Sequence, residues 1–522
     1  MLAVISSHAP VGIEGQLVTV EVDIRRGLPG IDVVGLPDGA VREAKERVRV
    51  AIRNSGFSFP ADRILVSLAP AGLRKEGASY DLSVALGILM ASGQVNSIGS
   101  TDIMVLGELN LSGGVRPVNG ALSAVGTGLE SGITRFLVPR ENLREARALS
   151  RGAVYGIESL REAAQTLAEI SSGSSFHPGS AQCLPHDVSD ASPEPGSDGT
   201  DISDIRGHDQ LKRAMEISAA GRHHLLLFGP PGSGKTLAAR RIASILPPLT
   251  REESLCVTRI HSIAGILPRA AGLVLRPPLR MPHHSASSEG IIGGGRGLKP
   301  GEVSLAHHGI LFLDEAPEFG MRLLQSLREP VEDGTVSIAR AGAVTRFPAV
   351  FQLILAFNPC PCGNLGRDSH VCVCSRPEIL RYWRRMGGAL LDRVDVRVPL
   401  DPVSPEKMTA PVNPGEGGLI RERVFWATRI QRERFAGQDF SWNSRIPPGA
   451  MDRFCRLGKD GERALVDAAK KHSISSRAFH SIQRMSRTIA DLESSVEIES
   501  RHVLEAVELR RYGDSDFFWT RS

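Results

Sequence analysis

Short apolar runs alternate with stretches of helical period in the middle of the chain. Apolar residues dominate 224–228, 309–313 and 351–357, and each run has the length of a buried strand. After the first run, apolar side chains recur at helical spacing over 237–246. Strands that alternate with helices are typical of an α/β fold with a parallel sheet. We therefore predict an α/β core over residues 202–400.

Two stretches of low hydrophobicity divide the chain. Residues 171–201 consist mainly of Ser, Pro, Gly and Asp, which is typical of a flexible linker. Residues 401–418 form a second break, and beyond it apolar residues recur at three- and four-residue spacing. These breaks predict an N-terminal domain (1–170), the α/β core and a helical C-terminal domain (419–522).

Composition narrows the class of protein. The 522 residues are 41% hydrophobic and 23% charged, which is ordinary for a soluble protein. The net charge of +4 is too small to indicate nucleic-acid binding by itself. No apolar stretch approaches the roughly 20 residues that span a bilayer, and the N-terminus lacks the basic flank of a signal peptide. We expect a cytoplasmic protein that does not bind membranes.

A phosphate-binding motif follows the first apolar strand. Residues 229–236 read GPPGSGKT and open the following helix. The glycines allow consecutive backbone N–H groups to face phosphate oxygens at the helix N-terminus. Lys235 is expected to reach the β- and γ-phosphates, and Thr236 to ligate Mg²⁺. The predicted ATP-binding residues are Gly229, Pro230, Pro231, Gly232, Ser233, Gly234, Lys235 and Thr236.

Polar residues follow the other two strands. Asp314 is expected to hold Mg²⁺, and Glu315 to orient and deprotonate the attacking water. The alternative for Glu315 is a carboxylate that stabilises a helix N-terminus. Asn358 is expected to bind that water or the γ-phosphate. Because parallel strands end at the same sheet edge, these side chains should converge, and ATP and Mg²⁺ are the predicted cofactors.

Four cysteines lie close together after Asn358. They occur as two C-x-C pairs, and four thiolates at this spacing can close a tetrahedral site for structural Zn²⁺. The alternative is a set of reduced, packed thiols. The candidate ligands are Cys360, Cys362, Cys372 and Cys374. The adjacent His283 and His284 are expected to point in different directions and to form structural hydrogen bonds.

The motifs together resemble the magnesium-chelatase-like AAA+ ATPases, and among them the YifB/ComM family. The resemblance rests on GPPGSGKT, PHHSAS followed by IGGG, PGEVSLAHHGILFLDEAPEF, NPCPCGN, LLDRVDV and SSRAFHSIQRMSRTIADL, which occur in this order. It also includes two N-terminal segments, GLPGIDVVGLPDGAVREAKERVRVAIRNSGFSFP and LAPAGLRKEGASYDLSVALGIL. It implies an AAA+ P-loop core, a C-terminal helical lid and a homo-hexameric ring with ATP sites between subunits.

The resemblance also assigns two arginines. Taken alone, Arg393 and Arg477 are typical of surface arginines in ion pairs. The family implies that Arg393 is the arginine finger and Arg477 the sensor-2 residue. The best-understood relatives are DNA helicases that promote branch migration during natural transformation, so the implied function is an ATP-dependent ring motor on DNA. The alternative is a chaperone-like remodeller or a metal-chelatase-like subunit that acts on a protein partner.

Two inserts in the core are candidates for DNA contact. One contains Arg296 and Lys299 in a Gly-rich segment, and the other alternates apolar and polar residues around Arg340, which predicts a hairpin. In a ring, both tips would project towards the pore and contact phosphates without sequence preference. The alternative is that the inserts pack the ring together.

The first 170 residues resemble the catalytic domain of Lon protease, an α+β fold. That chemistry requires a serine activated by a lysine. Ser79 falls at the nucleophile position, but Leu122 occupies the position expected for the lysine. We therefore expect a non-proteolytic scaffold or a collar that contacts DNA.

Overall fold

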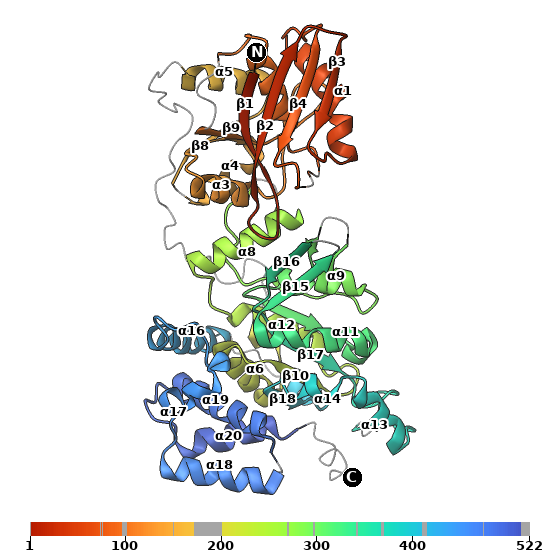
Figure 1. Ribbon diagram of the computed structural model, residues 1–522. Coiled ribbons are helices and arrows are strands. Elements are labelled where there is room, and N and C mark those ends of the chain that lie inside the picture. The colour runs from red at the N-terminus through yellow and green to blue at the C-terminus, as the bar shows by residue number, and fades with distance from the viewer. Residues whose placement is uncertain are drawn as a thin grey trace.

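The computed structural model is shown in Figure 1. The predicted linker over 171–201 lies outside the described residues except at its two ends, and so does Arg296. The side chain of Arg340 is also not described. The structure describes residues 2–73, 75, 77–96, 102–149, 151–171, 201–268, 271–295, 298–340, 343–366, 370–403, 405–409, 415–472 and 474–512.

The N-terminal part contains a seven-stranded mixed sheet, in the order β3-β4-β2-β1-β5-β8-β9. The strands β1, β2 and β4 pair antiparallel, and β5, β8 and β9 pair parallel. The strands are β1 (Leu2–Ala9), β2 (Gln16–Arg25), β3 (Gly30–Val34), β4 (Arg63–Ala69), β5 (Ile103–Val105), β8 (Arg135–Pro139) and β9 (Ala153–Ile157), with a separate small ladder of β6 (Glu108–Leu109) and β7 (Val115–Arg116).

Helix α2 lies in the core of the N-terminal part. Its sequence, DLSVALGILMA, has few polar residues on any side, which favours this position. All of its residues are buried, as expected for a helix that is apolar all round. Gly87 allows close contact with β2, since a Cβ atom there would lie 2.6 Å from Val22 Cγ2. The helices here are α1 (Gly39–Asn54), α2 (Asp81–Ala91), α3 (Ala121–Glu130), α4 (Leu143–Ala146) and α5 (Leu160–Ser171).

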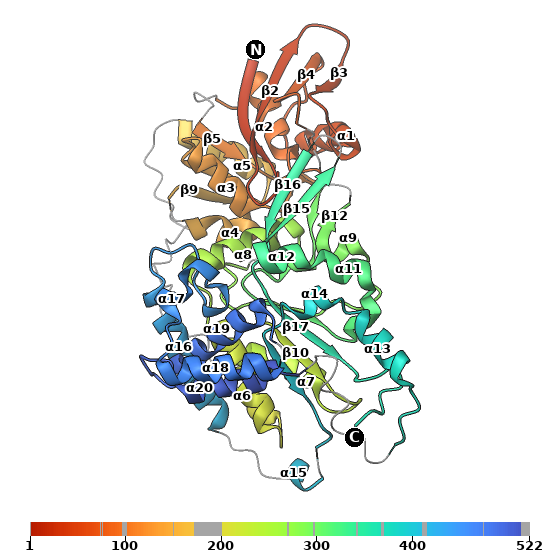
Figure 2. The same ribbon diagram turned by 60° about the horizontal axis from the view of Figure 1, so that its bottom comes forward.

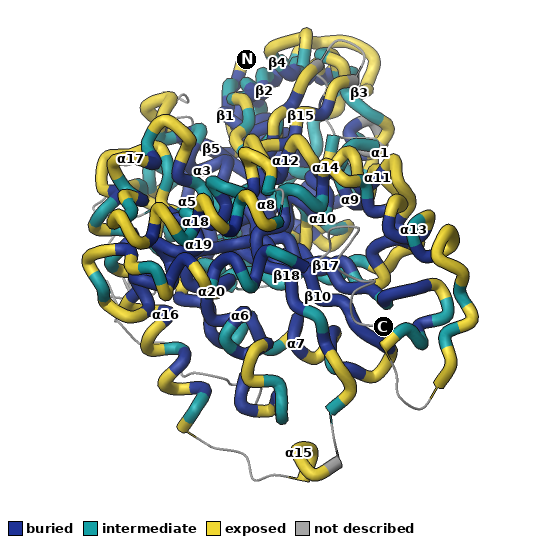
Figure 3. Tube along the Cα trace, turned by 90° about the horizontal axis from the view of Figure 1, so that it is seen from below, coloured by how far each residue is buried: buried dark blue, intermediate teal, exposed yellow. Residues whose placement is uncertain are grey.

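A five-stranded parallel sheet forms the core of the central part, which confirms the predicted parallel α/β core. Its order is β11-β14-β17-β10-β18, and every residue of β10, β14 and β17 is buried. Figure 3 shows β10 and β17 among the buried elements in the interior of the molecule. The strands are β10 (Leu225–Phe228), β11 (Leu279–Arg280), β14 (Ile310–Leu313), β17 (Gln352–Phe357) and β18 (Val396–Pro399).

Helices and two inserts surround the central sheet. The predicted hairpin is present, and its strands β15 and β16 extend towards the N-terminal sheet (Figure 2). The other insert pairs the short strands β12 and β13. The elements are α6 (Asp209–Gly221), α7 (Lys235–Ile242), α8 (Arg251–Ala264), α9 (Ser288–Ile292), β12 (Gly293–Gly294), β13 (Lys299–Pro300), α10 (Glu302–Leu305), α11 (Met321–Ser326), α12 (Arg328–Asp333), β15 (Thr335–Arg340), β16 (Ala343–Pro348), α13 (Arg376–Arg384) and α14 (Gly388–Leu391).

The C-terminal part is helical, as its apolar spacing predicted. The second break in the sequence contains a short helix, α15, and α16 begins before that break ends. Helix α19 packs against α6, α16 and α20. The helices are α15 (Pro405–Thr409), α16 (Glu416–Arg434), α17 (Met451–Phe454), α18 (Lys459–His472), α19 (Ser476–Leu492) and α20 (Ser500–Arg510). Among the described residues, no helix combines the length and apolar character needed to cross a bilayer.

Buried polar contacts join the three parts. His223 lies between the core and the helical part, where its ring nitrogens are 3.1 Å from Asp395 Oδ2 and 2.8 Å from Thr488 Oγ1. Glu145 joins the N-terminal part to α8, because its buried carboxylate accepts hydrogen bonds from the Leu122 N–H at 2.9 Å and from the Ser262 hydroxyl. The His223 contacts fix α19 relative to the central sheet, and the Glu145 contacts fix α8 relative to the N-terminal part.

Candidate active site

The loop of residues 229–236 connects the carboxyl end of β10 to the start of α7. Gly232 and Gly234 have φ angles of +83° and +87°, a conformation that glycine adopts without a steric penalty. Gly229 is needed for a different reason, since a Cβ atom there would lie 2.2 Å from the Leu400 carbonyl oxygen. The sequence therefore dictates a tight loop that places a helix N-terminus over the sheet edge, as phosphate binding requires.

Lys235 occupies the centre of this loop. Its ammonium group donates to the carbonyls of Gly229 at 2.7 Å and Pro230 at 3.0 Å, and to Asn358 Oδ1 at 3.1 Å. Burial lowers the pKa of Lys235, while the carboxylates of Asp314 and Glu315 oppose that change. The contact with Asn358 shows that the ends of β10 and β17 converge.

Thr236 lies beside Asp314. The Thr236 hydroxyl donates to Asp314 Oδ2 at 2.6 Å, and Asp314 Oδ1 accepts from the Glu315 N–H at 3.0 Å. This proximity follows from the parallel pairing of β17 with both β14 and β10. Leu313 pairs in register with Leu355, and Phe228 pairs with Phe357. Hydroxyl and carboxylate oxygens are the ligand class that Mg²⁺ prefers, so these two side chains fit a Mg²⁺ site.

Glu315 has a φ angle of +50°, an unusual conformation for a residue with a side chain. Its side chain is 58% exposed, and His284 Nδ1 lies 3.7 Å from its Oε2. The expectation that His283 and His284 diverge is wrong, because their ring centroids lie 4.1 Å apart. His283 does form the expected structural hydrogen bond, to Ser285 Oγ at 2.8 Å. The position of His284 beside Glu315 was not predicted from the sequence. The PHHSAS motif, which contains His284, was the signal that could have indicated it.

Arg393 and Arg477 lie together and are bound to the same carboxylate. Arg393 Nη2 is 2.6 Å from Glu332 Oε1, and Arg477 Nη2 donates to the same oxygen. The described contacts of these two side chains do not include the loop around Lys235. The carboxylate accepts a hydrogen bond from Arg393 and one from Arg477, and both lower the pKa of Glu332. Each arginine forms the ion pair that its sequence context alone predicted.

The four candidate cysteine ligands form one cluster. Their Sγ atoms all lie within 4.8 Å of one another. Cys360 Sγ is 3.4 Å from Cys362 Sγ and 3.7 Å from Cys372 Sγ. A tetrahedral site with Zn–S bonds near 2.3 Å requires sulfur separations of about 3.8 Å, so the cluster fits Zn²⁺. Desolvation favours the neutral thiol of Cys362, but hydrogen bonds from the Asn364 N–H and from other thiols lower its pKa to about 6.

The cysteine cluster is adjacent to the phosphate-binding loop. Gly363, with a φ angle of +75°, approaches that loop so closely that a Cβ atom there would lie 2.9 Å from Pro231 Cδ. Trp383 Nε1 donates to the Pro359 carbonyl at 2.9 Å, which fixes the chain between Asn358 and the cluster. The conformation of the cysteine segment can therefore affect the loop that surrounds Lys235.

The candidate DNA contacts lie on the two inserts. Lys299 is exposed on β13, and the hairpin places Arg340 at the end of β15, paired in register with Ala343. The hairpin also lies near the N-terminal part, since a Cβ atom at Gly12 would be 3.3 Å from Thr345 Cγ2. Arg296 and the Arg340 side chain lie outside what the structure describes.

Three family descriptions match the chain in succession. "Subunit ChlI of Mg-chelatase" matches residues 20–142, "Magnesium chelatase, subunit ChlI" matches 201–408, and "Magnesium chelatase, subunit ChlI C-terminal" matches 417–510. The 38 kDa magnesium-chelatase subunit of Rhodobacter capsulatus is 26% identical over 176 residues, which cover 30% of this chain and 50% of that protein.

Two further relatives match over nearly their whole length. The protein YifB of Salmonella typhimurium is 39% identical over 512 residues, which cover 98% of this chain and 97% of that protein. The competence protein ComM of Haemophilus influenzae is 38% identical over 513 residues, with coverage of 98% and 97%. The chain therefore belongs to the YifB/ComM family of magnesium-chelatase-like proteins.

Proposed function

We propose that the chain is an AAA+ ATPase that works as a ring-shaped motor on DNA and promotes branch migration during recombination in natural transformation. One observation carries the ATPase part of this proposal. Hydrogen bonds connect Lys235 with Asn358, and Thr236 with Asp314, so three strand ends converge on one phosphate-binding loop. Ligands of parallel α/β sheets bind at this edge.

Each residue of the site has a role in this proposal. Lys235 exchanges its carbonyl contacts for the β- and γ-phosphates of ATP, and the loop N–H groups bind the remaining phosphate oxygens. Glu315 orients the attacking water and takes its proton, and Asn358 binds that water or the γ-phosphate. Thr236 and Asp314 hold Mg²⁺, which neutralises charge on the phosphates.

The ring part of the proposal explains the position of the arginines. Arg393 and Arg477 bind Glu332 rather than the loop of their own chain, so a role at the ATP of an adjacent copy is compatible with their position. An arginine supplied in trans stabilises the charge of the transition state for phosphoryl transfer. A homo-hexamer, with Arg393 as the finger and Arg477 as the sensor-2 residue, is the arrangement we propose.

DNA is proposed as the substrate on two grounds. A protein named for competence is 38% identical to this chain over nearly its whole length. In addition, the hairpin of β15 and β16 begins two residues after Asp333, the end of α12, and projects from the ATPase core. We propose that Arg340, Arg296 and Lys299 contact DNA phosphates. A motor with this substrate would work in the cytoplasm.

We further propose that residues 1–170 form a Lon-like domain without protease activity, followed by the linker 171–201, the core 202–400, the linker 401–418 and the lid 419–522. Leu122 is fully buried at the position expected for the catalytic lysine. Lys75, which lies four residues before Ser79, is a candidate substitute base, but it is buried and its ammonium group donates to the Pro70 carbonyl. Leucine cannot act as a base, and the hydrogen bond of Lys75 to Pro70 supports the proposal that Ser79 is not activated.

We also propose that the cysteine cluster holds a structural Zn²⁺. Four thiolates complete the tetrahedral coordination of this ion, so no open position remains for a substrate. The contact of Gly363 with Pro231 supports a role in shaping the phosphate-binding loop.

The alternative is a subunit that remodels a protein partner, because the chain also resembles a magnesium-chelatase subunit over 176 residues. The discriminating experiment measures the ATPase rate alone and with single-stranded, duplex and four-way-junction DNA. Stimulation by DNA is expected. An ATPase that ignores all three DNA forms, and responds instead to a protein partner, would support the alternative.

A further inference from the structure

Glu332 forms ion pairs with two arginines, although the proposed mechanism requires both of them at the ATP of an adjacent copy. One oxygen of its carboxylate, Oε1, binds both Arg393 Nη2 at 2.6 Å and Arg477 Nη2. The carboxylate lies on α12, and the arginines lie before β18 and at the start of α19. Three segments that are distant in the sequence therefore meet at one charge.

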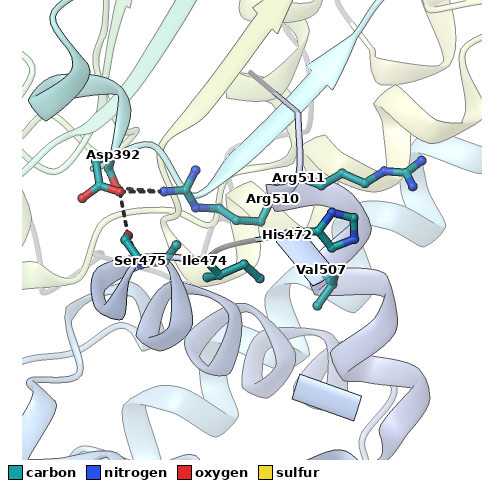
Figure 4. Close-up of a pocket in the computed structure, with 8 residues that line it drawn as sticks. Asp392, His472, Ile474, Ser475, Val507, Arg510 and Arg511 are labelled. Carbon is teal, nitrogen blue, oxygen red and sulfur yellow. Dashed lines mark hydrogen bonds and ion pairs between the residues drawn. The ribbon is translucent and has the colours of Figure 1, made fainter. Parts of the chain in front are cut away.

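The two arginines are held side by side by contacts that do not involve Glu332. Asp392, which precedes Arg393, accepts hydrogen bonds from the Ser475 hydroxyl at 3.2 Å and from Arg510 Nη2 at 3.3 Å. Ser475 is also the N-cap residue of α19, the helix that carries Arg477. Figure 4 shows these contacts beside a pocket of about 160 Å³. Removing the Glu332 charge should therefore leave the arginine pair in place.

Ligands can reach this cluster from solvent. A groove of about 350 Å³ is lined by Glu332 and Arg393, and Glu329 and Asp333 add negative charge to its wall. The Glu332 and Arg477 side chains are 37% and 41% exposed. Arg328 also lines this groove, and the Arg393 side chain is only 9% exposed. A phosphate therefore gains both guanidinium groups only when Glu332 leaves them.

We propose that Glu332 is an autoinhibitory stand-in for the terminal phosphate of an ATP molecule bound to an adjacent copy of this chain. The inference rests on the proposed ATPase ring. A terminal phosphate carries more charge than a carboxylate and offers three oxygens, so it can displace Glu332 when the adjacent copy presents it. Until then, the carboxylate keeps Arg393 and Arg477 from acting on a neighbour.

The position of Glu332 connects this inhibition to the hairpin. Glu332 lies three residues before Thr335, the first residue of β15, and the connection turns at Gly334 with a φ angle of +67°. The Gly334 carbonyl accepts from the Ala349 N–H at 2.7 Å, so both ends of the hairpin are fixed to this turn. A hairpin displaced by DNA would move Glu332 and release the arginines. DNA would then stimulate hydrolysis in the adjacent site.

The test compares Glu332→Gln with the control Glu329→Gln, which removes an exposed carboxylate of the same helix and groove. Glutamine keeps the size of the side chain but removes its charge. Exposed ion pairs contribute modestly, so we expect the ATPase rate without DNA to rise about fivefold in Glu332→Gln. The stimulation ratio with DNA should fall by the same factor, and Glu329→Gln should match wild type.

A second variant, Glu332→Asp, keeps the proposal testable if Glu332→Gln does not fold. Glu332→Asp keeps the charge but withdraws it by one methylene group, so its rate without DNA should lie between those of wild type and Glu332→Gln. If wild type hydrolyses no ATP or ignores DNA, the proposed function fails. If wild type responds to DNA but neither variant raises the rate without DNA, the ATPase motor stands and the autoinhibitory role of Glu332 is refuted.

Discussion

The substitution Glu315→Gln tests the chemistry of the site most selectively. The Glu315 side chain is 58% exposed, and its described partner is His284 at 3.7 Å. Losing so weak and exposed a pair should change the free energy of unfolding by less than about 0.5 kcal/mol. Glutamine cannot accept the proton of the attacking water, however, and the loss of a general base costs about 100-fold to 10,000-fold in rate.

This loss of rate corresponds to about 2.7 to 5.4 kcal/mol in the activation barrier, far more than the effect on folding. The assay combines steady-state ATP hydrolysis with ATP binding measured by a fluorescent analogue. Binding should match wild type because Lys235 and Thr236 are unchanged. The control Glu318→Gln removes a neighbouring carboxylate that pairs with Arg385 at 3.5 Å, and it should hydrolyse ATP normally. If Glu315→Gln kept a wild-type rate, Glu315 would be structural and the assigned mechanism wrong.

Three further predictions concern the ring, the metal and the DNA contact. Arg393→Ala and Lys235→Ala should each abolish ATP hydrolysis. Co-assembled mixtures should recover part of the activity, because one subunit supplies Lys235 and its neighbour supplies Arg393; mixed rings without activity would argue against a shared site. Elemental analysis of protein purified anaerobically without chelator should find one Zn²⁺ per chain, and a value near zero would leave the cysteines as packed thiols. Arg340→Ala should keep the ATPase rate without DNA but weaken DNA binding, most strongly at low salt, because the loss of one phosphate contact reduces the salt dependence; unchanged binding at every salt concentration would show that the hairpin does not contact DNA.

The local parts of the nucleotide site were predictable from sequence. Strand, loop and helix follow one another within residues 225–242, so the positions of Lys235 and Thr236 depend mainly on nearby residues. The convergence of Asp314 and Asn358 on that loop was also predictable, because parallel strands end at a common sheet edge. In the structure, Asn358 accepts a hydrogen bond from Lys235, and Asp314 accepts one from Thr236. The predicted convergence is therefore confirmed.

Contacts between distant segments were not predictable in the same way. Glu332 is 61 residues from Arg393 and 145 residues from Arg477, and no local pattern indicates that the three meet. Glu145 likewise binds Ser262 across the boundary between the N-terminal part and α8. Such contacts depend on how whole elements pack, because hydrophobic periodicity identifies a buried face but not the partner that covers it.

The most direct test of the central claim is ATP-driven migration of a synthetic four-way DNA junction. Wild-type protein should convert the junction to duplex products at a rate that depends on ATP, while Lys235→Ala and Glu315→Gln should not, because both lack hydrolysis. That result would show that ATP hydrolysis at this site drives the migration of DNA junctions. Wild-type protein that hydrolyses ATP but neither binds nor migrates the junction at low salt would contradict the account and favour a protein partner.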